Sequence, residues 1–405
     1  MTQSLGDQYN RCTIFIHDRD EDMKKVLSAG AALLLTTSIA QAGGLDRSGQ
    51  GVGIIFEEGN VVQLSFGFVS PEVSGETVST VAGAPIGQTS GNMAVAYSQF
   101  AGGVKYGIND QVDVALIFDQ PFGANVDYSD NSAFYYAGAT TAEVSSTAIT
   151  ALARYKIDEN YSIHGGLRYQ SIEATIGLPA VRSYNLEGES SSGTGIVVGA
   201  AYEIPDIALR VSLTYSSSIT HDMPSTENCA APASFCDNAE STTTFKSPES
   251  LNLDFQTGIA EDTLLFGSIR YAKWTQFDFA PATYNILTTN ALNPEGSSLQ
   301  SYDEDTFAYS LGVGRRLSDA FSGAVSIGYE AAQGGFSGNL GPTDGNVSFG
   351  LGGTYTTGDT KVTAGIRYIM LGDADTENPT APTTVATEFR DNSAIGFGMQ
   401  ITQSF

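Results

Sequence analysis

Positive charge is scarce in this chain of 405 residues. It has 19 lysines and arginines against 45 aspartates and glutamates, which gives a formal net charge of −26 at pH 7. Nucleic acid is bound by clustered basic residues, so this balance argues against a nucleic-acid partner. Long apolar runs are also missing. Residues 26–35 are apolar but too few to cross a bilayer, and no other stretch reaches the roughly 18 residues of a membrane-spanning helix.

Motifs of known chemistry are absent as well. After residue 42 the chain has two histidines, His164 and His221, and no Gly-x-Ser-x-Gly motif of a serine hydrolase. No cysteine and histidine cluster has zinc spacing, and no acidic loop has the EF-hand pattern. We therefore predict no enzyme activity, no cofactor and no metal site, and we interpret His164 as a packing or hydrogen-bonding residue.

Cysteines are few, and two of the three are close together. Cys229 and Cys236 lie seven positions apart in a polar segment, whereas Cys12 belongs to the N-terminal region. An exported protein meets an oxidising compartment, which favours a disulfide between Cys229 and Cys236. Two free thiols are the alternative.

The N-terminal region contains an export signal. A short basic region begins at Met23, residues 26–35 are apolar, and Ala40-Gln41-Ala42 forms a small-x-small cleavage site. We predict a secretory signal peptide over 23–42, with an ordinary buried helix as the alternative. Residues 1–22 are polar and acidic, and we predict that this upstream extension is not translated or not retained.

The last segment alternates between large apolar and small or polar residues. Ile395, Phe397, Met399 and Ile401 follow this period of two, and the chain stops at Phe405. Such a period indicates a strand with one apolar face and one polar face. A terminal aromatic residue at the end of such a strand is similar to the signal that the barrel-assembly machinery reads in bacterial outer-membrane proteins.

Similar alternating segments recur along the chain and predict an all-β fold, a transmembrane antiparallel β-barrel of 14 strands occupying residues 61–405. Short connections alternate with long ones, as expected for periplasmic turns and outer loops, so both chain ends lie on the periplasmic side. A secreted β-sandwich or β-helix is the alternative. The predicted strands are Val61–Val69, Met93–Tyr106, Gln111–Tyr128, Thr141–Ile157, Tyr161–Ile176, Gly195–Glu203, Ile207–Thr220, Thr243–Ile259, Thr263–Phe279, Asp305–Leu317, Ala320–Ala332, Asn346–Thr356, Thr360–Leu371 and Ser393–Phe405.

The same alternation assigns the two faces of the wall. In residues 307–314 large apolar residues alternate with alanine, serine and glycine, and lipid must receive the large ones. Four arginine–tyrosine pairs place the arginine in the lumen and the tyrosine at the membrane interface. We expect these arginines to meet inward carboxylates such as Asp113, Asp119 and Glu173, the alternative being that they only fill the lumen. The pairs are Arg154-Tyr155, Arg168-Tyr169, Arg270-Tyr271 and Arg367-Tyr368.

Residues 43–60 precede the first predicted strand and show no regular alternation. The segment is rich in glycine and has one apolar cluster, Val52, Ile54, Ile55 and Phe56. A flexible tail would not need that cluster, so we predict an N-terminal plug (hatch) that lies in the lumen. A disordered periplasmic tail is the alternative.

The third predicted strand is interrupted at Gln120, Pro121, Phe122 and Gly123. Proline cannot donate to a ladder, so inside a sheet it marks an edge or a bulge, and a nearby glycine eases a kink. A kink in the wall breaks bonds between strands and opens a gap towards lipid. The alternative is that Pro121 ends the strand near the outer rim.

Several motifs accompany these features. They are Ser48-Gly49, Glu57-Glu58-Gly59-Asn60, the stretch from Val69 to Gly75, Pro248-Glu249-Ser250-Leu251, and the stretch from Tyr271 to Phe277. With them the chain resembles the FadL-type outer-membrane transporters of long-chain fatty acids and aromatic hydrocarbons over nearly its whole length after the signal peptide. The resemblance implies a fourteen-stranded barrel with a hatch and a kinked third strand, and it favours a monomer. The Asn-Pro-Ala motif expected after Asn60 is missing, and Glu173 lies about where a carboxylate-binding cation is expected.

We therefore predict passive uptake of hydrophobic compounds across the outer membrane of a Gram-negative bacterium, where lipopolysaccharide blocks direct partitioning. A ligand would bind outer-loop residues, pass to the plug and leave sideways at the kink after the plug moves. Acidic outer loops, such as residues 303–305, would be solvated or would bridge divalent ions to lipopolysaccharide. A general diffusion porin, a structural or adhesive barrel and a barrel enzyme are the alternatives. The predicted ligand-binding residues are Val52, Ile54, Ile55, Phe56, Phe118, Phe122, Arg168, Phe279, Tyr284, Ile286 and Leu287.

Overall fold

The computed structural model describes residues 45–230, 236–289 and 293–405. The upstream extension (1–22), the signal peptide (23–42) and the first two residues of the predicted plug (43–60) lie outside the described residues. Among the helices in the described ranges, none is long and apolar enough to cross a membrane.

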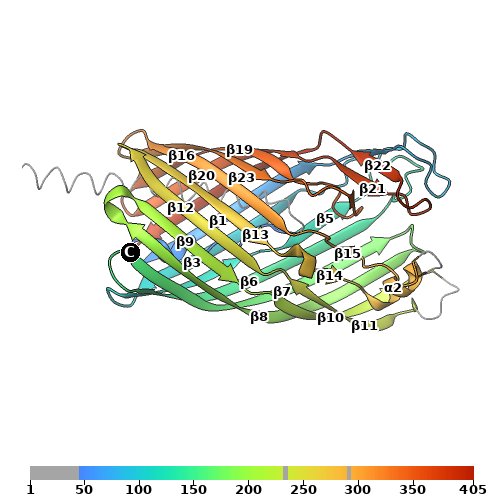
Figure 1. The fold of residues 1–405 in the computed structure, drawn as a ribbon, viewed down its shortest axis with the longest axis horizontal. Helices are drawn as coiled ribbons and strands as arrows, with labels where there is room; N and C mark the ends of the chain where they lie inside the picture. The colour runs from blue at the N-terminus through green and yellow to red at the C-terminus, as the bar shows by residue number, and fades with distance from the viewer. Residues whose placement is uncertain (1–44, 231–235, 290–292) are drawn as a thin grey trace, which may run out of the picture.

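The main sheet closes on itself, which confirms the predicted barrel (Figure 1). The first strand pairs antiparallel with the last, from Val61↔Ser404 to Glu72↔Ser393. Closure leaves no strand edge in lipid, where unpaired backbone groups would be costly. The sheet has 17 strands, and three wall strands are each split in two, so fourteen wall strands surround the lumen. In chain order they are β1 (Val61–Glu72), β3 (Tyr97–Gly107), β4 with β5 (Val112–Asp119, Gly123–Asp127), β6 (Thr141–Lys156), β7 (Tyr161–Leu178), β8 (Tyr184–Ile204), β9 with β10 (Leu209–Ser216, Ile219–Asn228), β11 with β12 (Ala239–Ser247, Ser250–Ala260), β13 (Thr263–Ala272), β16 (Thr306–Arg316), β17 (Phe321–Glu330), β19 (Asn346–Thr357), β20 (Thr360–Leu371) and β23 (Ser393–Ser404).

Tight turns join the wall strands at the end of the barrel where the C-terminus lies (Figure 1). Asparagine and aspartate shape them by accepting bonds from the backbone two and three residues on. The Oδ1 of Asn109 accepts from the N–H groups of Gln111 and Val112, both at 2.9 Å. Long connections lie at the other end. They carry a small sheet of β2 (Gly75–Thr77), β18 (Phe336–Ser337), β21 (Ala374–Glu377) and β22 (Val385–Phe389), the pair β14 (Asp278–Phe279) and β15 (Gln300–Ser301), and the helix α2 (Ala282–Thr288).

The two faces of the wall follow the predicted alternation. In β16 the large residues from Phe307 to Val313 are exposed on the outer face, and the alanine, serine and glycine residues between them face the lumen. All four arginines of the arginine–tyrosine pairs are buried in the lumen, and Tyr155, Tyr169 and Tyr368 are exposed outside. The prediction for these pairs is therefore confirmed by the geometry of the strands.

The prediction for their carboxylate partners is wrong in part. Glu173 has the same parity as Tyr169 on β7, so its side chain lies on the outer face, where it accepts a bond from Ser145. It neither meets an arginine nor occupies a ligand site in the lumen. Asp113 does face inward, but it pairs with Lys105 and Lys156 at 3.0 Å each.

Several strand boundaries differ from the prediction. β8 begins at Tyr184 rather than at Gly195, because its outer part rises above the lipid and does not need apolar residues on its outer face. Residues 93–96 are not part of β3. The predicted strand Thr263–Phe279 ends at Ala272 and continues as a 3-10 turn, η5 (Trp274–Gln276), which brings Trp274 into the interior.

Candidate functional site

The first described residues of the predicted plug bind the backbone of the kink. The Arg47 N–H donates to the Pro121 carbonyl at 2.8 Å, and the Gly123 N–H donates to the Leu45 carbonyl at 2.9 Å. Asp46 and Phe122 form an isolated antiparallel bridge. Because Pro121 lacks an N–H group, the third wall strand cannot continue its own ladder here. The plug supplies part of the missing backbone pairing.

Buried polar side chains hold the same part of the plug against the opposite wall. Arg270 on β13 donates to Asp46 at 2.6 Å, to the Gly49 carbonyl at 3.1 Å and to Asn252 at 2.8 Å. Both members of the Arg270–Asp46 pair are almost fully buried. Ser48 donates to Asp119 at 2.6 Å. A buried ion pair with all its hydrogen bonds made is strongly destabilised when one partner is removed.

The apolar part of the plug packs lower in the lumen. Residues 53–56 form a short 3-10 turn, η2 (Gly53–Phe56), and Val52, Ile54, Ile55 and Phe56 are buried in one cluster. The wall contributes small and aliphatic residues to this cluster, namely Ala115, Ile117, Leu152, Val197 and Ala201. The Phe56 ring lies under the guanidinium groups of Arg154 and Arg210, at 4.8 and 5.0 Å. The predicted apolar residues of the plug are therefore together, below the polar anchor.

The kink leaves an opening between β3 and β4. Their ladder stops at the pair Gly102↔Phe118. Above it the Gln120 side chain accepts a bond from the Phe100 N–H at 2.8 Å and so replaces a backbone partner. A Cβ atom on Gly123 would lie 2.6 Å from the guanidinium carbon of Arg47. A side chain at position 123 would therefore push the Arg47 guanidinium of the plug aside.

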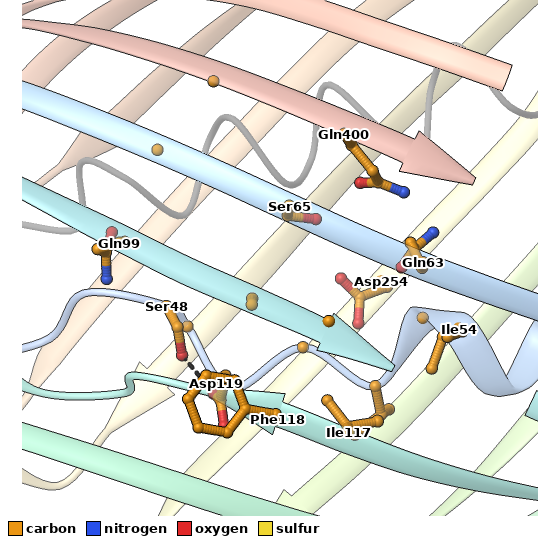
Figure 2. Close-up of a pocket in the computed structure, with 18 of the residues that line it drawn as sticks. Ser48, Ile54, Gln63, Ser65, Gln99, Ile117, Phe118, Asp119, Asp254 and Gln400 are labelled. Carbon is orange, nitrogen blue, oxygen red and sulfur yellow. Dashed lines mark hydrogen bonds between the residues drawn. The ribbon is translucent and has the colours of Figure 1, made fainter. Parts of the chain in front are cut away.

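A cavity of about 200 Å³, which we call the gate cavity, lies at this opening (Figure 2). Its inner lining includes Val52, Ile54 and Phe56 of the plug. Its lining also includes Phe100 and Phe118, which are exposed on the outer face of the wall. The gate cavity therefore touches both the plug and the lipid-facing surface. Phe118, a predicted ligand-binding residue, lies at its outer side.

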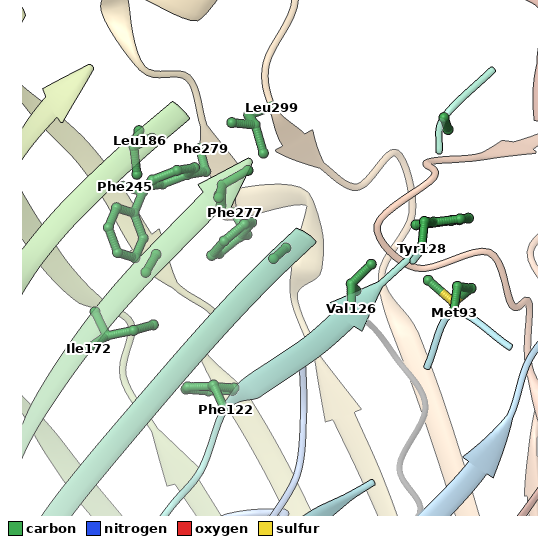
Figure 3. Close-up of a cluster of buried hydrophobic side chains, with 14 of the residues drawn as sticks. Met93, Phe122, Val126, Tyr128, Ile172, Leu186, Phe245, Phe277, Phe279 and Leu299 are labelled. Atoms are coloured by element: carbon green, nitrogen blue, oxygen red, sulfur yellow. The ribbon is translucent and has the colours of Figure 1, made fainter. Parts of the chain in front are cut away.

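A second cavity of about 200 Å³, the outer cavity, lies among the outer ends of the strands. Figure 3 shows the buried apolar cluster that surrounds it. Of the outer-loop residues predicted to bind ligand, Phe279 lines the cavity, and Tyr284 and Leu287 pack on the surrounding cluster. Ile286 is 56% exposed and does not belong to the cluster. Burial raises the pKa of the Tyr284 and Tyr302 hydroxyls further above its ordinary value, at which a tyrosine is already uncharged near neutral pH. The other apolar residues of the lining are Leu45, Ala124, Ala142, Val144, Ile172, Ala174, Ile176, Met223, Phe245, Phe277, Phe336, Leu299 and Leu340.

Phe122 and Arg168, two of the predicted ligand-binding residues, make contacts that the sequence did not predict. Phe122 at the kink belongs to the outer cluster and makes an edge contact with Trp274, at 5.8 Å between ring centres. Arg168 lines neither cavity. It donates to Thr150 at 2.8 Å, to Ser216 at 3.4 Å and to the Gln50 carbonyl at 3.5 Å, so it holds the plug. Phe245 was missed as a site residue because a single aromatic residue in an outer segment carries no distinctive pattern. Trp274 and Phe277 belong to the stretch from Tyr271 to Phe277 that supports the family resemblance, but their place in the buried outer cluster was not predicted.

Glu227 holds the helix α2 over the outer cavity. This carboxylate is fully buried and accepts bonds from Tyr184 at 2.7 Å and from Ser241 at 2.8 Å. It also accepts from the first N–H groups of α2, those of Thr283 and Tyr284, at 3.1 Å. An anion is favoured at the free N–H groups of a helix start. Cys229 and Cys236, which the structure joins in a disulfide, lie directly after Glu227 on the same hairpin.

Glu227→Ala is expected to release α2 from the wall. A hydrogen bond to a charged group contributes about 1.5–3 kcal/mol, so losing several at once should raise amide exchange in 282–288 by at least tenfold. Hydrogen–deuterium exchange with mass spectrometry measures this. Glu240→Ala, at an exposed position of the neighbouring strand, is the matched control and should leave the exchange unchanged. Equal exchange in both variants would show that Glu227 does not anchor the helix.

Within the described ranges, no group of three histidine, cysteine, aspartate or glutamate side chains is placed to hold a metal ion. The anchors around the plug instead combine arginines with single carboxylates. Both cavities have mixed linings: carboxylates such as Asp303 and Glu330 line the outer cavity beside its apolar residues, and Asp119 and Arg270 line the gate cavity. The apolar parts of the two linings can bind apolar molecules, and hydrogen bonds hold the plug in place between them.

The chain is similar to outer-membrane transport proteins both in sequence pattern and in fold. A family model described as outer membrane protein transport protein (OMPP1/FadL/TodX) matches residues 54–405. No curated protein matches the chain. A FadL homologue from Pseudomonas aeruginosa has a TM-score of 0.69 at 11% identity, with 94% of this chain and 98% of that chain covered.

Two further solved structures have a similar fold. For the toluene transporter TodX of P. putida the TM-score is 0.56 at 13% identity, with 86% of this chain and 91% of that chain covered. For the monoaromatic hydrocarbon channel CymD it is 0.55 at 14% identity, with 90% and 98% covered. At these identities the likeness concerns the fold alone.

Proposed function

Because the chain belongs to the outer membrane protein transport family (OMPP1/FadL/TodX), we propose that it takes up hydrophobic compounds passively, such as long-chain fatty acids or hydrocarbons. Membership confirms the resemblance drawn from the sequence and places the protein in the outer membrane of a Gram-negative bacterium. The family is one of transporters rather than enzymes. The observation that carries the proposal is the pair of cavities. One faces the outer loops and has aromatic and aliphatic side chains over part of its lining, and the other touches both the plug and the outer face of the wall.

The outer cavity is suited to capture. Phe245, Phe277 and Phe279 line it on one side, and the small residues Ala142 and Ala174 leave space on the other. Transfer of a ligand from water into such a lining releases about 0.8 kcal/mol for each buried CH₂ group. A chain of several CH₂ groups, or one aromatic ring, is therefore bound without an energy source.

We propose that the ligand moves from the outer cavity past Phe122 to the gate cavity, and from there into lipid beside Phe118. The bonds between the plug and the kink lie across this path, because Arg47 and Leu45 bind the backbone on both sides of Phe122. Plug movement that breaks these bonds would open the path. Lateral exit at the kink delivers an apolar molecule to the membrane without exposing it to the periplasm.

We also propose two partners for the barrel, the barrel-assembly machinery and lipopolysaccharide. Phe405 is exposed at the end of β23 and so remains accessible to the barrel-assembly machinery. The outer ends of the strands would be surrounded by lipopolysaccharide, and the barrel would act as a monomer. A general diffusion porin needs an open, water-filled lumen, whereas here Arg270, Asn252 and Arg168 hold the plug across it.

Filling the outer cavity tests the proposal. Ala174 faces the cavity, and its neighbour Thr175 is exposed on the outer face of the same strand. Ala174→Phe is expected to weaken binding of toluene and of a long-chain fatty acid to the purified protein by at least tenfold, because the new ring occupies the ligand's space. Thr175→Phe should bind as the unmodified protein does. Equal binding by the two variants, or a large steady conductance for small ions in planar bilayers, would contradict the proposal.

A further inference from the structure

The barrel wall has a second interruption, far from the kink. β8 pairs with β9 up to Val197↔Ser216 and with β10 from Gly188↔Ser225 onward. Between these points, residues 189–196 and 217–224, all of them described, have no registered strand partner across this boundary. We call this boundary the β8–β10 seam.

Side-chain parity explains the seam. β8 has an extra residue at 189–190, where its register with β7 shifts. Up to Gly188 the even-numbered residues face inward, and from Ser191 onward the odd-numbered residues do. The neighbouring strand has its extra residue at the other end of the seam, between Ser216 and Ile219, which both face inward. Along the seam, inward positions of one strand therefore oppose outward positions of the other, and a regular ladder cannot form.

A few side-chain bonds partly replace the ladder. Ser191 donates to the Asp222 carbonyl at 2.9 Å, and His221 Nδ1 lies 3.2 Å from the Ser191 carbonyl. The other ring nitrogen of His221 lies 3.1 Å from the Gln170 side chain. At the inner end of the seam the Ile196 N–H donates to the Ser217 hydroxyl, and the Ser217 N–H donates to the Ile196 carbonyl, both at 3.0 Å. These contacts are fewer than a continuous ladder of the same length would supply, so the seam should open more easily than the rest of the wall.

Apolar side chains seal the seam against glycines. Met223 packs on Gly188, and Ile219 packs on Gly193, so closely that a Cβ atom at either glycine would collide with the neighbouring side chain. Met223 also lines the outer cavity. It therefore lies between the cavity and the seam. Methionine is unbranched and flexible, which suits a side chain that has to move aside.

The seam begins where the apolar outer surface of the wall ends. On β8 the outward residues Ile196 and Val198 are apolar and exposed, whereas Thr194 and Ser192 above them are polar. Thr220 and Asp222 on β10 are exposed at the same boundary. The seam thus faces the level at which acyl chains meet the polar part of the outer leaflet.

We propose that the β8–β10 seam is a lateral portal through which small apolar molecules, already dissolved in the outer leaflet, reach the outer cavity directly. This inference rests on the proposed function. It adds a route that bypasses the outer loops. The molecule passes between β8 and β10 at the level of residues 188–193, Met223 moves aside, and the molecule enters the outer cavity from the membrane boundary.

Cross-linking the seam tests the portal. Thr194→Cys with Thr220→Cys places two exposed thiols on opposite sides, to be joined on whole cells by a short bis-maleimide and checked by mass spectrometry. The expected result is at least a fivefold fall in the initial uptake rate of radiolabelled toluene. The same double variant treated with N-ethylmaleimide carries the added groups without the link and should keep its uptake.

A matched pair across a regular ladder controls for stiffening of the wall. Thr175 and Glu187 lie directly opposite each other on β7 and β8, and both are exposed outside. Cross-linked Thr175→Cys with Glu187→Cys should transport normally. Unchanged uptake in the cross-linked seam, or an equal fall in the control pair, would overturn the portal. Absence of toluene uptake by the unmodified protein would instead count against the proposed function.

Discussion

Replacing Pro121 by Val and Gly123 by Thr is expected to reduce uptake to background while the barrel stays folded. A regular strand sequence restores the N–H group missing at Pro121 and allows β4 and β5 to continue as one strand beside residues 97–101 of β3. Closing that opening separates the plug from Phe118 and removes the gate cavity. Uptake of toluene by cells and resistance of the folded barrel to unfolding in detergent are the two measurements.

The substitution at Gly123 has a side effect that must be distinguished from closure of the opening between β3 and β4. The new Cβ at position 123 lies close to the Arg47 guanidinium and would displace it. Arg47→Ala removes the same guanidinium, with its bond to Asn125 at 2.7 Å, while the kink remains. It should retain most of the uptake. Normal uptake by the straightened variant would refute lateral exit, and loss of uptake in Arg47→Ala alone would assign the effect to the plug.

Asp46→Ala is expected to free the plug from the wall. Arg270 would be left buried without its carboxylate, and breaking a buried pair on one side costs about 3–5 kcal/mol. Since each 1.4 kcal/mol is a factor of ten, the undocked plug should become at least about a hundredfold more frequent. Single-channel recordings in planar bilayers should then show openings to small ions that the unmodified protein lacks.

A surface carboxylate provides the comparison for this prediction. The Asp319 side chain is 95% exposed in a periplasmic turn, so Asp319→Ala changes the net charge equally without touching the plug. Its recordings should match those of the unmodified protein. The double variant Asp46→Ala with Arg270→Met removes both charges and should open less often than Asp46→Ala alone. Silent recordings from Asp46→Ala would show that the plug is held mainly by its other contacts.

The strands and their faces could be predicted because lipid imposes one rule on every wall residue. Phe307, Leu311 and Val313 must face acyl chains, so a period of two along the chain is enough to assign them. Arg367 and Tyr368 obey the same rule. Glu173 was misassigned because its charge suggested the lumen, although its parity with Tyr169 places it outside, where β7 has already left the lipid and a carboxylate is solvated.

The candidate site could be predicted only in outline. Pro121 and Gly123 indicated a break in the wall, since the chemistry of a single residue decides whether a ladder continues there. Asp46 gave no such signal, because its partner Arg270 is 224 residues away. Phe245 lies on β11, whereas Trp274 and Phe277 lie together in the segment after β13, and the two segments meet only in the closed barrel.

The sequence by itself determined that the chain crosses a membrane as alternating strands, that a glycine-rich segment precedes them and that one strand is kinked, because these properties depend on neighbouring residues. Only the tertiary structure decided which carboxylate holds the plug, where the two cavities lie and that residues 189–196 and 217–224 have no registered partner across the β8–β10 seam. Each of these depends on the relative register of strands far apart in the chain. A shift of one residue leaves the local pattern unchanged but reverses which side chains meet.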